Sequence, residues 1–216
     1  MEKLEELFVA ALVDVGVDES DRAVILRYLS ILRDKGEIHQ QHYAHSLRVG
    51  MKSREIARFV HHEERPLLIA GAFHDIGKCH ISCVTLARTE VWTADDQDAI
   101  EQHVMQGHTL LRDRFDLSAE ILVWHHRFQY HGYPKQMPDH LHGYAETTKL
   151  LIAEYGRIVA LADVYDALGR VNSSSGGVRL SGQEIRRQMH ELNRDRRRLI
   201  DALYDGRVFS ENDRRE

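Results

Sequence analysis

The stretch LLIAGAFHDIGK, residues 67–78, decides how the rest of the chain is interpreted. Its first seven residues are apolar on every side, which predicts a helix buried in the centre of the fold. Pro66, just before them, fits the first turn of such a helix. His74 and Asp75 follow at the helix end, where a carboxylate would be cut off from water and would need a partner. Lys78 could be this partner, in an ion pair with Asp75, but such a pair does not explain the neighbouring His74. A metal ion would explain both His74 and Asp75.

The composition is that of a globular protein and excludes several classes. The chain has 216 residues, of which 43% are hydrophobic and 29% charged, with a formal net charge of −5. A negative balance argues against a DNA-binding protein, which is usually basic. No apolar run approaches the about 18 residues that a membrane span needs, and the acidic start MEKLEELF is unlike a signal peptide. With only two cysteines as well, we expect a cytoplasmic protein without membrane contact.

Apolar residues recur at intervals of three and four, which predicts an all-α, single-domain helical bundle. Helices are expected at 19–33, 38–61, from Pro66 onwards, and at 93–114, 118–126, 145–155, 157–169 and 181–204. Residues 128–143 should form a loop, and NSSSGG at 172–177 a flexible connection. We expect N-terminal helices (1–36) that pack on the core, the core itself (37–171), and a flexible loop with a C-terminal helical extension (172–216).

Histidine is unusually frequent, with 15 residues, and it is the commonest metal ligand. His45 shares a helix face with apolar residues, and taken alone it is better explained as a hydrogen-bonded core histidine. Neighbouring histidines point in different directions, so one of His125 and His126 could bind metal while the other contacts substrate. Asp163 is enclosed by apolar residues. The candidate ligands are His45, His74, Asp75, His103, His125, His126 and Asp163, whereas His39, His42, His108 and most other histidines are expected at the surface or in loops.

A mixture of imidazole and carboxylate ligands suits transition metals better than Mg²⁺ or Ca²⁺. Manganese, iron, cobalt, nickel and zinc are all compatible with such ligands. Two ions about 3.5–4 Å apart, bridged by one carboxylate, generate a hydroxide and bind a phosphate group.

These motifs together resemble those of a known family. The order His45, His74-Asp75, Asp163 is similar to that of the HD superfamily of metal-dependent phosphohydrolases, which are all-helical. HDIGK (74–78), His103 with Gly107, His125-His126, GYP (132–134) and ADVYDAL (162–168) resemble the HD-GYP branch, whose known members hydrolyse cyclic di-GMP. The resemblance covers roughly residues 41–168.

The resemblance implies a role for each candidate. Asp75 would bridge the two metal ions and take part in catalysis. Lys78 would also be catalytic, by orienting a phosphate oxygen. The first ion would be held by His45, His74, Asp75 and Asp163, and the second by Asp75, His103, His125 and His126. Arg127 and Tyr133 would contact the substrate, and Gln41 and Asp166 would support the ligands from behind.

The sequence departs from the branch at three places. The third position of the usual HHE is Arg127, the segment FQYHGYP lacks an Asp-Gly, and Gln41 stands where members with three metals carry glutamate. Arg127 and Gln41 both remove a carboxylate, which favours a site with two metals.

The leading interpretation is therefore a metal-dependent phosphohydrolase that uses a hydroxide bridging two metals to cleave a cyclic dinucleotide of the cyclic di-GMP type. A nucleotide phosphatase or dNTP hydrolase of the wider superfamily is the first alternative. A degenerate HD domain that binds a nucleotide or a protein is the second. A homodimer and a separate regulatory partner are both compatible with the sequence.

Overall fold

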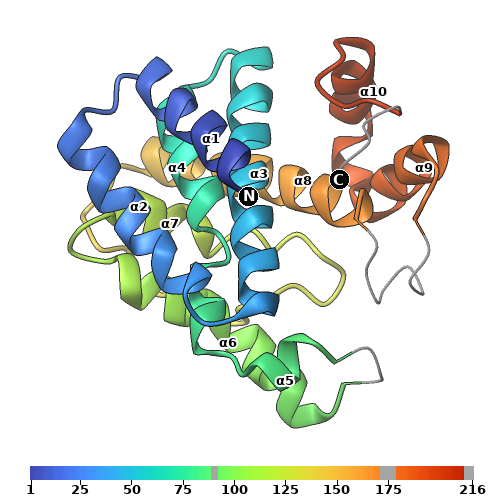
Figure 1. Ribbon diagram of the computed structural model, residues 1–216. Coiled ribbons are helices and arrows are strands. Elements are labelled where there is room, and N and C mark those ends of the chain that lie inside the picture. The colour runs from blue at the N-terminus through green and yellow to red at the C-terminus, as the bar shows by residue number, and fades with distance from the viewer. Residues whose placement is uncertain (89–91, 171–178, 212–216) are drawn as a thin grey trace.

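A computed structural model describes residues 1–88, 92–170 and 179–211 (Figure 1). In these residues the chain forms ten α-helices and two short 3₁₀ helices, with no strand, which confirms the all-α fold. No helix among them is both long enough and apolar enough to cross a bilayer.

The elements follow one another along the chain with short connections. The α-helices are α1 (Glu2–Asp14), α2 (Glu19–Arg33), α3 (Glu37–Phe59), α4 (Glu64–Phe73), α5 (Cys83–Leu86), α6 (Ala94–Leu111), α7 (Asp116–Leu122), α8 (Glu146–Leu168), α9 (Gly182–Leu192) and α10 (Arg197–Asp205). The 3₁₀ helices are η1 (Ile76–His80) and η3 (Arg194–Arg196).

The long helix α3 is the centre of the bundle and packs against α4 and α8. Every residue of α4 from 67 to 73 is buried, as its all-apolar sequence predicts. The two helices approach so closely that a Cβ atom on Gly50 would lie 2.7 Å from the carbonyl oxygen of Leu68. A side chain at Gly50 would therefore push α4 away from α3, and α4 is the helix that leads into His74.

The remaining helices flank this centre. In Figure 1, α1 and α2 lie on one side of α3, and α9 and α10 lie on the other. A groove of about 800 Å³ runs between α1 and α3, and α9 packs against α8. The division into N-terminal helices, core and extension stays a prediction, and the connection at 172–177 lies outside the described residues.

Three expected helix boundaries are wrong. The helix predicted at 118–126 ends at Leu122 as α7, so His125 and His126 lie in the turns that follow it. The predicted break at Gly156 is absent, because α8 is one helix from Glu146 to Leu168. Gly156 instead makes room for Trp124, whose Cβ atom would lie 2.2 Å from a Cβ atom on Gly156. The predicted helix 181–204 is interrupted near Asn193, whose buried side-chain amide donates to the carbonyl oxygen of Met189.

We expect Gly50→Ala to destabilise the protein by about 1–3 kcal/mol, because overpacking a tight core forces the backbone to move. The free energy of unfolding in urea measures this effect. Gly143→Ala is the matched control, since a Cβ atom there meets nothing within 4 Å. Equal stabilities of the two variants would contradict a close helix crossing at Gly50.

Candidate metal centre

The carboxylate of Asp75 lies at the centre of a cluster of buried histidines. Asp75 follows α4 and is 1% exposed. Its two oxygens face different groups of side chains. Oδ1 is 3.2 Å from Nε2 of His103 and 3.9 Å from Nε2 of His125, and Oδ2 is 3.4 Å from Nε2 of His74 and 3.7 Å from Nε2 of His45. This is the arrangement that a carboxylate bridging two ions needs.

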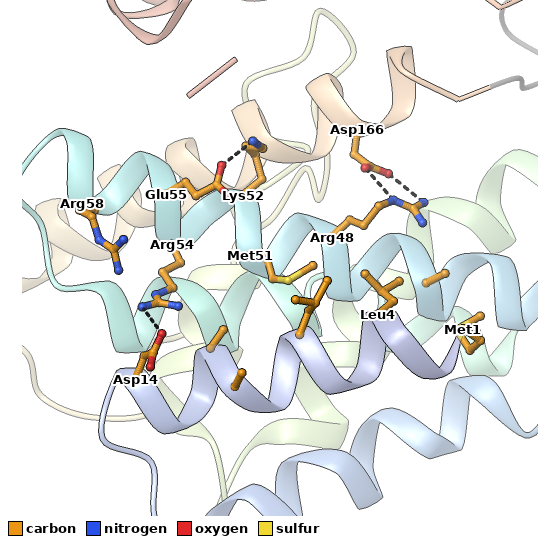
Figure 2. A pocket seen from close by; sticks show the side chains of 14 residues that line it. Met1, Leu4, Asp14, Arg48, Met51, Lys52, Arg54, Glu55, Arg58 and Asp166 are labelled. Atoms are coloured by element: carbon orange, nitrogen blue, oxygen red, sulfur yellow. Dashed lines mark hydrogen bonds and ion pairs between the residues drawn. The ribbon is translucent and has the colours of Figure 1, made fainter. Parts of the chain in front are cut away.

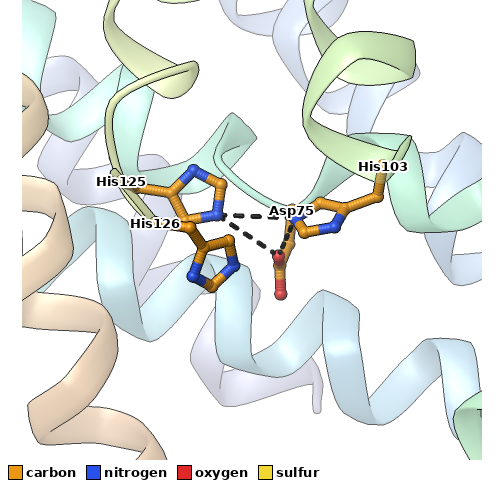
Figure 3. Close-up of side chains that lie close together, drawn as sticks. All are labelled: Asp75, His103, His125 and His126. Carbon is orange, nitrogen blue, oxygen red and sulfur yellow. Dashed lines mark hydrogen bonds and ion pairs between the residues drawn. The ribbon is translucent and has the colours of Figure 1, made fainter. Parts of the chain in front are cut away.

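The potential ligand atoms fall into two compact groups. Asp75, His103, His125 and His126 form one group, which Figure 3 shows converging from α6, from the segment after α7 and from the end of α4. His45, His74 and Asp163 form the other. Within each group the ligand atoms lie within 4.8 Å of one another. The structure thus brings together all seven candidates from the sequence, with Asp75 belonging by this distance to the first group only.

Three of the histidines are oriented by the same kind of hydrogen bond to the local backbone. His74, His103 and His125 each direct Nδ1 to the carbonyl oxygen three residues earlier, in Gly71, Ile100 and Leu122. A carbonyl oxygen can only accept, so Nδ1 carries the proton and donates. Nε2 is then left unprotonated, with its lone pair directed at the carboxylates, which is the form that binds a metal.

His45 is held by a carboxylate instead. Its Nδ1 lies 2.7 Å from Oδ2 of Asp166, and its Nε2 lies 3.0 Å from Oδ1 of Asp163. Arg48 donates to both oxygens of Asp166, at 2.9 and 3.2 Å, so this carboxylate joins α3 to α8 (Figure 2). Asp166 therefore lies directly behind a ligand candidate, where the resemblance implied a supporting residue.

Two buried atoms of the cluster lack a hydrogen bond among the described residues. They are Nε2 of His74 and Oδ1 of Asp75. An unpaired buried acceptor is costly, and both atoms face the centres of the two groups. A divalent cation at each centre would satisfy them, and the imidazole and carboxylate donors suit a transition metal. The residues present therefore fit the metals that the sequence predicts.

The protonation states favour cation binding. Burial lowers the pKa of His125 to about 3 and that of His126 well below its usual value, so both are neutral at pH 7. Burial opposes ionisation of Asp75, but the ammonium group of Lys78 outweighs it and holds the pKa of this carboxyl well below the usual range. For Asp163, burial is likewise outweighed, chiefly by the hydrogen bond from His45, and its pKa is lowered.

One cavity, here called the first cavity, opens onto this cluster and has a volume of about 490 Å³. Lys78 lies at its wall, with Nζ 2.6 Å from Oδ2 of Asp75. Tyr133 lies beside it, with its ring centroid 4.5 Å from that of His126. Trp92, which is 45% exposed, forms an aromatic part of the wall. The first cavity therefore gives a ligand access to the metal centre.

Two predicted site residues are not brought to the cluster. Gln41 is exposed on α3 and is not among the residues that line the first cavity. Arg127 donates to the carbonyl oxygen of Pro134 at 2.9 Å, so it fastens the loop that carries Tyr133. It also does not line the first cavity.

The sequence analysis missed His42. It was expected at the surface or in a loop, but its Nδ1 is 3.8 Å from Oδ2 of Asp75 and it lines the first cavity. The signal was its position three residues before His45, which puts both on one helix face. His39 and His108 are also buried, contrary to expectation. His39 Nε2 lies 3.2 and 3.1 Å from the carbonyl oxygens of Lys78 and Ile81, near η1.

Comparison with known proteins gives one matching family. The family model described as "HD domain" matches residues 42–168. A "Cyclic di-GMP phosphodiesterase" of Thermotoga maritima is 32% identical over 152 residues, which are 67% of this chain and 37% of that protein. The "Cyclic di-GMP phosphodiesterase response regulator RpfG" of Xanthomonas campestris is 36% identical over 111 residues, 49% of this chain and 27% of that protein. The matches thus span about a third of these relatives.

Solved structures show the same fold. The HD domain of the L. monocytogenes phosphodiesterase PgpH aligns with a TM-score of 0.52 and 15% identity, over 81% of this chain and 85% of that one. The same domain in complex with cyclic di-AMP aligns with a TM-score of 0.53 and 16% identity, over 82% and 85%. At such low identity these alignments support the fold alone.

We expect Asp75→Ala to lose bound metal while its helix content stays largely unchanged, because the variant removes the carboxylate that faces both ligand groups. Elemental analysis of manganese-loaded protein measures the first effect, and circular dichroism the second. Asp139→Ala, which removes an exposed carboxylate, should keep its metal. An Asp75→Ala variant that still bound the metal in the wild-type amount would show that the central ligand is assigned wrongly.

Proposed function

The chain belongs to the HD domain family, and on that premise we propose that it is a metal-dependent phosphodiesterase acting on a cyclic dinucleotide. The observation that carries the proposal is the division of the Asp75 oxygens between two groups of ligand atoms, next to a cavity that contains a lysine. A pair of divalent ions with an open side is suited to phosphoester hydrolysis.

We propose two divalent ions as cofactors, with iron or manganese favoured. One would be held by His45, His74, Asp75 and Asp163, and the other by Asp75, His103, His125 and His126. When bound, such ions supply a hydroxide nucleophile at neutral pH and neutralise charge on the phosphate oxygens.

The residues of the chain itself would orient the substrate. The ammonium group of Lys78 lies at the wall of the first cavity and can donate to a non-bridging phosphate oxygen, which stabilises the charge that develops there. Burial lowers the pKa of His42 to about 4, so this histidine is neutral at pH 7. It can then donate or accept a hydrogen bond without adding positive charge beside Lys78.

The substrate class is supported by the relatives and by the cavity wall. Both curated relatives are named for cyclic di-GMP, and the solved PgpH domain binds cyclic di-AMP. Trp92 and Tyr133 offer aromatic faces on which a nucleobase can stack. A nucleotide phosphatase and a non-catalytic binding module remain the alternatives that the experiment below separates.

The test is turnover of cyclic di-GMP by protein loaded with manganese or iron, with Asp75→Ala as the control. We expect linear dinucleotide or GMP, identified by chromatography, from the wild type and none from the variant. Hydrolysis of nucleoside phosphates without turnover of cyclic di-GMP would favour the phosphatase. Binding of cyclic di-GMP without any product would favour the binding module.

A further inference from the structure

A second cavity, of about 880 Å³, adjoins the metal centre. It shares Gln129 and His131 with the first cavity and reaches the ligand candidate His125. Its volume falls in the range of about 300–1,000 Å³ that is usual for small-molecule sites. The two cavities therefore border the same loop and the same cluster of histidines.

The C-terminal segment builds one wall of the second cavity. This wall consists of residues 191–195, at the junction of α9 and η3. The HD family match ends at residue 168, so the wall is supplied by a part of the chain outside the matched region. A substrate contact from this wall would thus be particular to this chain and those that share its C-terminal segment.

The wall is fixed in place by a buried arginine of α8. Arg157 is 1% exposed and donates to both oxygens of Asp195, at 3.0 and 2.7 Å, and to Oδ1 of Asn193 at 3.0 Å. Its guanidinium also lies 5.0 Å from the ring centroid of Phe128, in the loop. Charge-assisted, paired hydrogen bonds of this kind hold a precise geometry. Arg157 therefore positions the wall against the helix that carries Asp163.

Arg194 is the cation that this anchor presents to the cavity. Within the part of the chain that the structure describes, no hydrogen bond or ion pair is recorded for its side chain, although it lines the cavity. The two acidic residues of the wall are already engaged, since Asp195 pairs with Arg157 and Glu191 with Arg187. Arg194 is thus free to bind an anion.

The loop that follows α7 adds an aromatic surface to the second cavity. Tyr130 lines the cavity and is 96% exposed, and its ring contacts His131 edge to face, with the centroids 4.7 Å apart. A tyrosine face open to solvent and an unpaired guanidinium that line the same cavity are a combination suited to a nucleotide, because the base stacks and the phosphate pairs with arginine.

We propose that the second cavity is a nucleotide subsite of the metal centre, in which Arg194 binds the phosphate that is not cleaved and Tyr130 stacks on a base. The proposal rests on the proposed phosphodiesterase function and extends it. Under this proposal the site selects substrates that carry two phosphates. One phosphate lies at the metals, and Arg194 binds the other.

The test measures the hydrolysis of two substrates by manganese-loaded protein. Cyclic di-GMP carries two phosphates, whereas bis(4-nitrophenyl) phosphate has only the one that is cleaved. We expect Arg194→Ala to raise KM for cyclic di-GMP by about tenfold with kcat little changed, and to leave both constants for the small ester unchanged. Arg194→Lys should restore part of the loss, since it keeps the charge but not the paired donors.

Two further variants serve as controls. Arg198→Ala removes an exposed arginine that does not line the cavity and should behave as the wild type. Tyr130→Ala should raise KM for cyclic di-GMP several-fold, and Tyr130→Phe should not, because only the ring is needed for stacking.

The outcomes separate the two proposals. If the wild type cleaves the small ester but Arg194→Ala leaves KM for cyclic di-GMP unchanged, or Arg198→Ala raises it equally, the subsite is wrong and a phosphodiesterase remains. If the wild type cleaves the small ester but not cyclic di-GMP, the dinucleotide subsite is also wrong. If metal-loaded wild type cleaves neither, the proposed function itself fails and the subsite fails with it.

Discussion

The fold is organised around one buried carboxylate. Asp75 is 1% exposed, and histidines from four separate helices or helix ends face its two oxygens. Burying an ionised group is unfavourable unless it is paired, so the surrounding helices must deliver donors to it. Two glycines allow the helices to bring these donors close. Gly50 permits the close crossing of α3 and α4, and Gly77 lets the backbone of α6 approach η1. At Gly77 a Cβ atom would lie 1.9 Å from the carbonyl oxygen of His103.

The sequence predicts the residues of this cluster because the candidate ligands share a simple signature. His45, His74 and Asp163 are polar residues on strongly apolar helix faces, and such residues need an explanation. The all-α fold follows equally from the spacing of apolar residues. Arg127 and Gln41 were predicted from a motif position alone, with no physical requirement for a buried partner. The structure turns Arg127 to a loop carbonyl and leaves Gln41 exposed.

The features that the sequence could not predict depend on contacts between distant segments. Gly156 resembles a helix break until Trp124, more than thirty positions earlier, is seen to occupy the space beside it. His42 resembles any surface histidine until α4 delivers Asp75 next to it. The last helical stretch is interrupted at Asn193, and there the side-chain oxygen of Asn193 accepts a hydrogen bond from Arg157 on α8. Local propensity contains none of this information.

The pairing of Arg157 with Asp195 has a consequence for cooperativity. Detaching the C-terminal segment would strip a fully buried guanidinium of the carboxylate and the amide oxygen recorded as its partners. Leaving a buried charge uncompensated costs about 3–5 kcal/mol, a large fraction of the stability of a typical domain. The C-terminal segment therefore should not unfold independently of the core. It should open together with α8, so that its amide protons exchange with solvent at rates close to those of the helix that carries Asp163.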